Sequence, residues 1–182
     1  MTRTRYYVIA RYSAALCIAG IIIVSYISEV TAATSIVAFG ASNTRGKNAG
    51  GPAWPEYLQE MLRAKGYDVN VTNAGVNGDT TEGMLARLDS SVPNGTALVI
   101  LQPSVLNDAR HGGNGESRDA NITTMESRLR ARGIKFILFI RLKRFVPASY
   151  IAADGMHFTT AGHRLLAAHL LPEVIATLGQ PR

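Results

Sequence analysis

Short strand-like runs that alternate with helical segments constrain this chain more than any other feature. Residues 35–39, 97–101 and 135–140 are almost wholly apolar, and residues 68–72 alternate apolar with polar side chains. Such runs indicate β-strands buried on one or both faces. Because helical segments separate them, they predict a parallel sheet with helices on both faces. The expected fold class is a three-layer α/β/α, doubly wound parallel sheet of four to five strands.

The expected helices are marked by apolar side chains at helical spacing. Gly66 and Gly133 follow two of them, where a helix is expected to stop. Pro172 could bend the last one. The helices are expected at residues 53–65, 81–88, 121–132 and 159–178, with a glycine-rich loop at residues 111–115.

The first 33 residues differ in kind from the rest. The segment begins with basic residues, continues with an apolar stretch at residues 12–27, and ends in Ala32 and Ala33. That order is typical of a secretory signal peptide cleaved after one of these alanines. The apolar stretch is shorter than the roughly 20 residues of a membrane-spanning helix, which favours a cleaved signal over the alternative, an uncleaved anchor. We therefore expect a mature domain at residues 34–182, in the periplasm or secreted.

Composition excludes several classes of protein. A hydrophobic content of 47% excludes a disordered chain. The net charge of +6 falls to +4 without residues 1–33, which hold three Arg and Glu29. The remaining basic residues form no stripe with interleaved aromatics, so no nucleic-acid partner is expected. Cys17 is the only cysteine and lies in the signal segment, so the mature chain has neither a disulfide nor a cysteine nucleophile.

Polar residues that could take part in catalysis or binding follow three of the expected strands. Ligands of such sheets bind at these strand ends. Ser42 comes just after the first strand and Gly40, a place that suits an exposed nucleophile. Gly78 could bring a backbone N–H close to a ligand, and the side-chain amide of Asn107 could donate to an oxyanion. Taken singly, each of these residues also fits an ordinary turn or helix cap.

The segment before the last helix holds an acid and a base three residues apart. Asp154 and His157 could form the orienting group and the general base of a catalytic triad on one tight loop. The other histidines are less promising. His163 and His169 are expected at the surface or the core edge, and His111 is expected to face either substrate or solvent.

Four blocks in this order resemble the SGNH (GDSL-like) hydrolase family over nearly the whole mature chain. Within the family, the resemblance is to the small bacterial thioesterase, lysophospholipase and arylesterase branch. It implies a flavodoxin-like three-layer fold. The blocks are Gly40-Ala41-Ser42-Asn43-Thr44, Asn77-Gly78-Asp79, Asn107-Asp108 and Asp154-Gly155-Met156-His157.

The resemblance also implies a serine esterase mechanism that needs no metal and no organic cofactor. In it Ser42 is the nucleophile, His157 is the general base, and Asp154 orients the imidazole. The oxyanion hole consists of the N–H groups of Ser42 and Gly78 and the side chain of Asn107.

This sequence departs from the family pattern in three ways. Ala41 replaces the usual Asp before the nucleophile, outside the catalytic blocks. The third block lacks its usual Gly and has an extra residue, which predicts a displaced Asn107. Only 13 residues separate Ile140 from Asp154, which predicts a shallow, open site that suits short acyl groups.

The expected function is an exported esterase or deacylase that hydrolyses short-chain acyl esters or thioesters. Small aryl or alkyl esters and O-acetylated glycans are the candidate substrates, and the membrane is a partner only through an uncleaved N-terminal segment. The alternative, motivated by the altered block at Asn107, is a catalytically weak or inactive module that binds acylated glycans or lipids.

Overall fold

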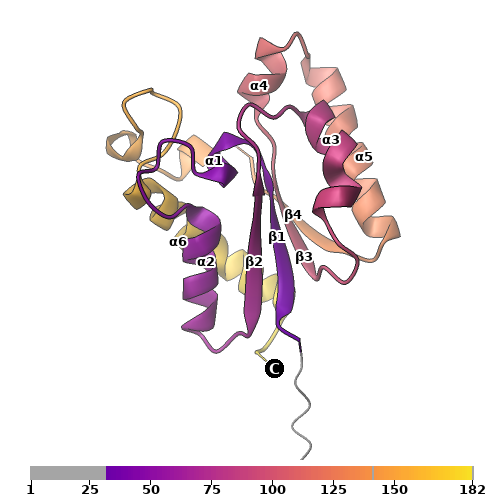
Figure 1. Ribbon diagram of the computed structural model, residues 1–182, viewed down its shortest axis with the longest axis vertical. Helices are drawn as coiled ribbons and strands as arrows, with labels where there is room; N and C mark the ends of the chain where they lie inside the picture. The colour runs from indigo at the N-terminus through magenta and orange to yellow at the C-terminus, as the bar shows by residue number, and fades with distance from the viewer. Residues whose placement is uncertain (1–31, 141, 182) are drawn as a thin grey trace, which may run out of the picture. The chain divides into compact units, whose positions relative to one another are not determined.

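A computed structural model describes residues 32–140 and 142–181, so the expected signal peptide lies almost wholly outside the described residues. The described part is built on one parallel sheet with the strand order β2-β1-β3-β4. Helices cover both faces of this sheet (Figure 1), which confirms the expected fold class. The strands are β1 (Thr34–Gly40), β2 (Val69–Gly75), β3 (Leu98–Gln102) and β4 (Lys135–Leu138).

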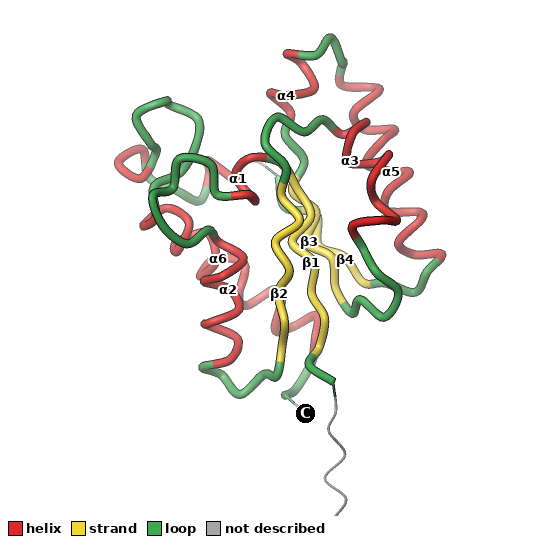
Figure 2. The backbone as a smooth tube through the Cα atoms, viewed as in Figure 1, coloured by secondary structure: helices red, strands yellow, loops and turns green. Residues whose placement is uncertain are grey.

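Each face of the sheet carries two long helices (Figure 2). One face is covered by α2 (Trp54–Arg63) and α6 (Thr160–Leu178), the other by α3 (Thr81–Ser91) and α5 (Gly115–Ala131). The shorter elements are α1 (Ser42–Arg45), α4 (Val105–Arg110) and two 3₁₀ turns, η1 (Leu142–Arg144) and η2 (Ala148–Tyr150). Within residues 32–140 and 142–181, no helix combines the length and apolarity needed to cross a membrane.

The apolar runs are explained by burial on both faces of the sheet. In β1, Ile36 packs into the cluster under α2 and α6, whereas its neighbours Val37 and Phe39 pack into the cluster under α3 and α5. All five residues of β3 are buried. Each such side chain contributes about 1.5–3 kcal/mol by leaving water, so the central strands anchor both helical layers.

Two elements differ from the sequence prediction. Residues 105–110 form α4 rather than an open strand exit, because Ser104 caps the N-terminus by accepting from the N–H of Asn107. Helix α5 begins at Gly115, six residues before the predicted start, because the side chain of Asn114 accepts from the N–H of Ser117 at 2.8 Å. Both starts depend on a polar cap followed by few apolar residues, so hydrophobic periodicity does not reveal them.

Three strands end at one level. Gly40 is in register with Gly75 of β2 on one side and with Gln102 of β3 on the other. The chain leaves β1 toward β2 and later crosses back to β3, so the connections diverge around the end of β1. Ligands of open parallel sheets bind at such a switch point, and Ser42 begins α1 there.

Helix α1 packs directly on the glycines at these strand ends. A Cβ on Gly75 would overlap the backbone nitrogen of Arg45, and one on Gly40 would overlap Oγ1 of Thr44. The buried Thr44 also donates from Oγ1 to Oε1 of Gln102 at 2.9 Å. The absence of a side chain at both strand ends therefore allows the helix that carries Ser42 to lie against the sheet.

His163 of α6 is fully buried, so the expectation of a surface or core-edge position was wrong. Its ring packs edge-on against Phe158, with ring centroids 5.9 Å apart. Neither ring nitrogen has a hydrogen-bond partner within the part of the chain that the structure describes. Burial lowers the pKa of His163 to about 4, while Glu56 opposes the fall and His157 adds to it.

We expect Gly75→Ala to lower the free energy of unfolding by about 2 kcal/mol, because the added methyl group must displace the backbone of α1. Urea denaturation measures this change. Gly115→Ala is the matched control, since a Cβ there meets only the flexible side chain of Arg118 at 3.7 Å. The control should change stability by less than about 0.5 kcal/mol. Equal stability of the two variants would contradict the close packing of α1.

The buried His163 predicts a loss of stability in acid. Its pKa is about 4 in the folded protein against 6.5 for a free histidine, so below pH 6.5 the unfolded chain gains a proton that the folded chain does not. This difference removes roughly 3 kcal/mol of folding free energy as the pH falls from 6.5 to 4. Urea denaturation of His163→Leu and His163→Gln should show a flatter pH dependence over that range, whatever the packing cost of each variant. If the free energy of unfolding of both variants depends on pH as steeply as that of the unsubstituted protein, His163 is not the source of the acid sensitivity.

Candidate active site

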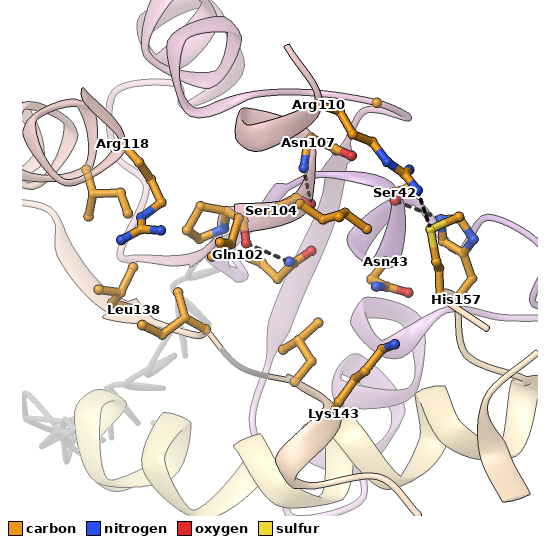
Figure 3. Close-up of a pocket in the computed structure, with 18 of the residues that line it drawn as sticks. Ser42, Asn43, Gln102, Ser104, Asn107, Arg110, Arg118, Leu138, Lys143 and His157 are labelled. Atoms are coloured by element: carbon orange, nitrogen blue, oxygen red, sulfur yellow. Dashed lines mark hydrogen bonds between the residues drawn. The ribbon is translucent and has the colours of Figure 1, made fainter. Parts of the chain in front are cut away.

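Ser42, His157 and Asp154 form a continuous hydrogen-bonded chain at the switch point of the sheet (Figure 3). Nε2 of His157 lies 2.9 Å from Oγ of Ser42, and Nδ1 lies 2.5 Å from Oδ2 of Asp154. His157 is buried. The structure thus brings together three residues that the sequence separates by up to 115 positions, in the geometry of a nucleophile, a base and an orienting carboxylate.

A tight turn before α6 presents His157 toward Ser42. Ile151 and Phe158 form an antiparallel bridge, and the N–H of Ala152 donates to the carbonyl of His157 at 2.7 Å. At the tip, Gly155 adopts a φ of 71°, a left-handed conformation that glycine adopts readily. Asp154 and His157 therefore lie on one tight turn that backbone contacts close at its base.

The hydrogen bonds around Asp154 hold it in its charged form. Its Oδ1 accepts from the N–H groups of Met156 and His157, both at 2.9 Å. Its Oδ2 accepts from Nδ2 of Asn48 at 2.6 Å, besides facing the His157 ring. The backbone N–H of His157, followed by its ring and the N–H of Met156, lowers the pKa of Asp154 far below the usual value for a carboxyl group. A fixed negative charge beside Nδ1 favours the tautomer that leaves Nε2 free to accept a proton from Ser42.

Two backbone N–H groups are available to a ligand near Ser42. Ser42 and Gly78 both line the cleft, and neither N–H has an acceptor among residues 32–140 and 142–181. Gly78 has a φ of 76°, which is unfavourable for other residues. Both N–H groups are therefore free to donate to a ligand in the cleft.

Arg87 of α3 ties the loop of Gly78 to the ends of two strands. Its guanidinium donates to Oδ2 of Asp79, with Nε at 2.8 Å. It also donates to the carbonyl oxygens of Ala74 and Gly40, both at 3.0 Å, and lies 4.2 Å from the ring centroid of Phe39. Since Asp79 follows Gly78 directly, Arg87 fixes this loop relative to the start of α1.

Asn107 lines the cleft and lies on the first turn of α4. One hydrogen of its amide is donated to the carbonyl of Asp79 at 2.8 Å. An amide nitrogen carries two hydrogens, so the second remains for a ligand. The next residue, Asp108, is buried and accepts at Oδ1 from the N–H and Oγ1 of Thr81, at 2.8 and 3.0 Å. This segment therefore forms a helical turn that is held against α3.

The cleft beside Ser42 has a volume of about 790 Å³, within the usual range for small-molecule sites. The prediction of a shallow, open site considered only the short segment before Asp154, whereas α4 and the first half of α5 also line the cleft, with Leu106 and Ile122 among their residues. A volume does not measure depth, so the shallow site and the preference for short acyl groups stay predictions.

Two residues of the site were missed by sequence reasoning. Asn48 has a φ of 61°, and Arg87 donates hydrogen bonds to residues up to 47 positions away. Neither belongs to a motif, and only the left-handed tendency of Asn in a glycine-rich loop could have suggested a special role for Asn48. As for a metal, no cluster of three or more His, Cys, Asp or Glu in the described ranges could hold one.

Comparison with known families gives a match that covers more than half of the chain. Residues 38–150 match the model of the GDSL-like Lipase/Acylhydrolase family. The match includes Ser42, Gly78 and Asn107 and ends four residues before Asp154.

Two curated proteins are similar in sequence. Esterase TesA of Pseudomonas aeruginosa is 28% identical over 141 residues, which cover 76% of this chain and 70% of that protein. An arylesterase of Vibrio mimicus is 30% identical over 98 residues, which cover 54% of this chain and 48% of that protein.

Solved structures show the same fold. A crystal structure of TesA aligns with a TM-score of 0.68 at 22% identity, over 79% of this chain and 99% of the other. The psychrotrophic esterase EstA from Pseudoalteromonas sp., inhibited by monoethylphosphonate, aligns with a TM-score of 0.69 at 16% identity, over 81% and 100%.

Proposed function

The chain belongs to the GDSL-like Lipase/Acylhydrolase family and is a carboxylic ester hydrolase, and we propose that Ser42, His157 and Asp154 carry out its reaction. The observation that carries this proposal is the hydrogen-bonded chain from Ser42 Oγ through the His157 ring to Asp154. Its geometry supports nucleophilic catalysis by Ser42.

In the first half of the reaction, Oγ of Ser42 attacks the acyl carbonyl while Nε2 of His157 takes its proton. The resulting oxyanion accepts hydrogen bonds from the N–H groups of Ser42 and Gly78 and from the amide of Asn107. His157 then gives its proton to the leaving alcohol, and the acyl group stays on Ser42. Asp154 stabilises the imidazolium throughout.

In the second half, water replaces the alcohol. His157 accepts a proton from the water as it attacks the acyl group on Ser42, and the oxyanion forms again in the same place. When it collapses, the carboxylic acid leaves and Ser42 recovers its proton from His157. The products are one alcohol and one acid for each water consumed.

The alternative of an inactive binding module has less support. It rested on a displaced Asn107, yet Asn107 lines the cleft together with Ser42 and Gly78 and retains a free amide hydrogen. The apolar side chains of α4 and α5 give the cleft room for an acyl group longer than acetyl. We infer a small-molecule or glycan acyl ester as the substrate.

We also propose that the protein is exported to the periplasm or secreted. The order of basic residues, apolar stretch and small residues within residues 1–33 supports export. An envelope or extracellular ester is then the substrate that the enzyme can reach.

A fluorophosphonate probe tests the nucleophile, because it reacts covalently with an activated serine. We expect the unsubstituted protein to be labelled and Ser42→Ala not to be labelled. Ser104→Ala, which removes another serine of the cleft, should still be labelled. The measurement is the labelled fraction by mass spectrometry with the modified residue mapped, and labelling of Ser42→Ala at the same level would exclude Ser42 as the nucleophile.

Arg87 provides a test of the oxyanion loop. Arg87→Lys keeps the charge but loses the planar fork, so Gly78 should shift and kcat for para-nitrophenyl acetate should fall about tenfold, with a smaller change in KM. Arg63→Lys is the matched control, because Arg63 makes a similar two-pronged contact with the carbonyl of Val69, at the opposite end of β2. Equal kcat values for the two variants would contradict a positioning role for Arg87.

A further inference from the structure

Three cations line the cleft near the catalytic serine. Lys47 follows α1, Arg110 ends α4 and Lys143 lies in η1. All three are exposed at the cleft. In Figure 3, the side chain of Arg110 reaches toward Ser42 and His157 from one wall, and that of Lys143 reaches up from another.

These cations differ from the other charges of the cleft because they lack carboxylate partners. The acids of the opposite wall are already paired, Asp119 with Arg118 at 2.8 Å and Glu126 with Arg130 at 3.0 Å. Asp154 directs both oxygens at His157, Met156 and Asn48. Among the residues that the structure describes, no carboxylate oxygen lies within 4.0 Å of Lys47, Arg110 or Lys143. The cleft therefore has uncompensated positive charge beside Ser42.

The three cations gather on the His157 side of the cleft. Nη2 of Arg110 lies 3.2 Å from Sδ of Met156, and Nζ of Lys143 donates to the carbonyl of Gly155 at 2.7 Å. Lys47 is next to Asn48, whose side chain donates to Asp154. Arg110 and Lys143 thus contact the turn that carries His157, and Lys47 adjoins in sequence a residue that is hydrogen-bonded to that turn.

This placement puts the cations near the alcohol half of an ester substrate. His157 must deliver a proton to the leaving oxygen, so the alcohol lies on the side of the cleft that His157 occupies. Apolar side chains also line the cleft, among them Leu106, Ile122 and Leu138. The cations near the turn of His157 thus face the alcohol, and the apolar side chains are available to the acyl group.

We propose that this enzyme prefers esters whose alcohol carries an anionic group, a carboxylate or a phosphate, and that Lys47, Arg110 and Lys143 bind that group. The inference rests on the proposed function, because it assigns the two sides of the cleft from the role of His157. Uncompensated cations in a cleft raise the local concentration of an anionic substrate and hold its charged end in place.

A matched pair of acetyl esters tests the preference. Para-acetoxybenzoate and para-acetoxybenzamide have the same acyl group and ring and differ in the charge of the alcohol. We expect kcat/KM to be about tenfold higher for the carboxylate at low salt, and the ratio to decrease in about 0.5 M NaCl because salt screens the attraction. Para-acetoxyphenyl phosphate, measured beside them, tells whether a phosphate dianion is preferred to a carboxylate.

Substitutions of the cations test whether they cause the preference for the carboxylate ester. Arg110→Gln and Lys143→Gln should each lower the carboxylate-to-amide ratio, and using both keeps the test valid if one variant does not fold. Arg144→Gln is the matched control, since Arg144 is exposed on the same 3₁₀ turn as Lys143 but does not line the cleft. It removes the same charge and should keep the ratio of the unsubstituted protein.

The outcomes separate this inference from the proposed function. Equal kcat/KM values for the two esters, both lost in Ser42→Ala, would overturn the preference and leave the esterase mechanism intact. A high ratio that neither Arg110→Gln nor Lys143→Gln reduces would overturn the role of the cations. Absence of Ser42-dependent hydrolysis of either ester would overturn the proposed function and this inference with it.

Discussion

The close packing of α1 on the glycine ends of β1 and β2 is the constraint on which the site depends. Gly40 and Gly75 leave no Cβ between the sheet and the helix, so Ser42 begins its helix at the level where three strands end. The loop of Gly78 and the first turn of α4 start from that same level. The donors of the cleft therefore meet Ser42 because of strand register, and the apolar burial that stabilises the central strands also sets the geometry of the site.

The other two residues of the proposed triad come from the far end of the chain and need a different support. His157 and Asp154 lie on a turn that is closed by the bridge between Ile151 and Phe158. Phe158 is buried in the cluster under α2 and α6, which ties this turn to the core. Asn48, which follows α1, then donates to Asp154, so the two halves of the site are joined by a polar contact besides the one between Ser42 and His157. A turn fixed at its base and at its tip can hold the imidazole in the orientation that proton transfer requires.

The sequence predicted what depends on local pattern and missed what depends on distant contacts. Apolar runs indicated the four strands, and glycines marked the ends of α2 and α5. The blocks around Ser42, Gly78, Asn107 and His157 indicated one shared edge of the sheet, and their place in the cleft agrees with that expectation. Helix α4 and the first turns of α5 were not predicted, because polar caps start them. Asn48 and Arg87 could not be recognised, because their partners lie 106 and 47 positions away in the sequence and no periodicity records such a contact.

The residues proposed for catalysis and those proposed for substrate preference lie on different parts of the fold. The proposed catalytic groups lie at strand ends and on a turn anchored in the core, where a displacement of about 1 Å would cost much of the rate. The cations proposed to bind the alcohol lie on the surface of α4, on η1 and after α1, and their side chains contribute little to the buried clusters. A change of charge at these positions leaves strand register and core packing untouched, since exposed substitutions rarely alter stability by more than about 0.5 kcal/mol. The preference for one kind of alcohol can therefore vary without disturbing the core on which the proposed site is built.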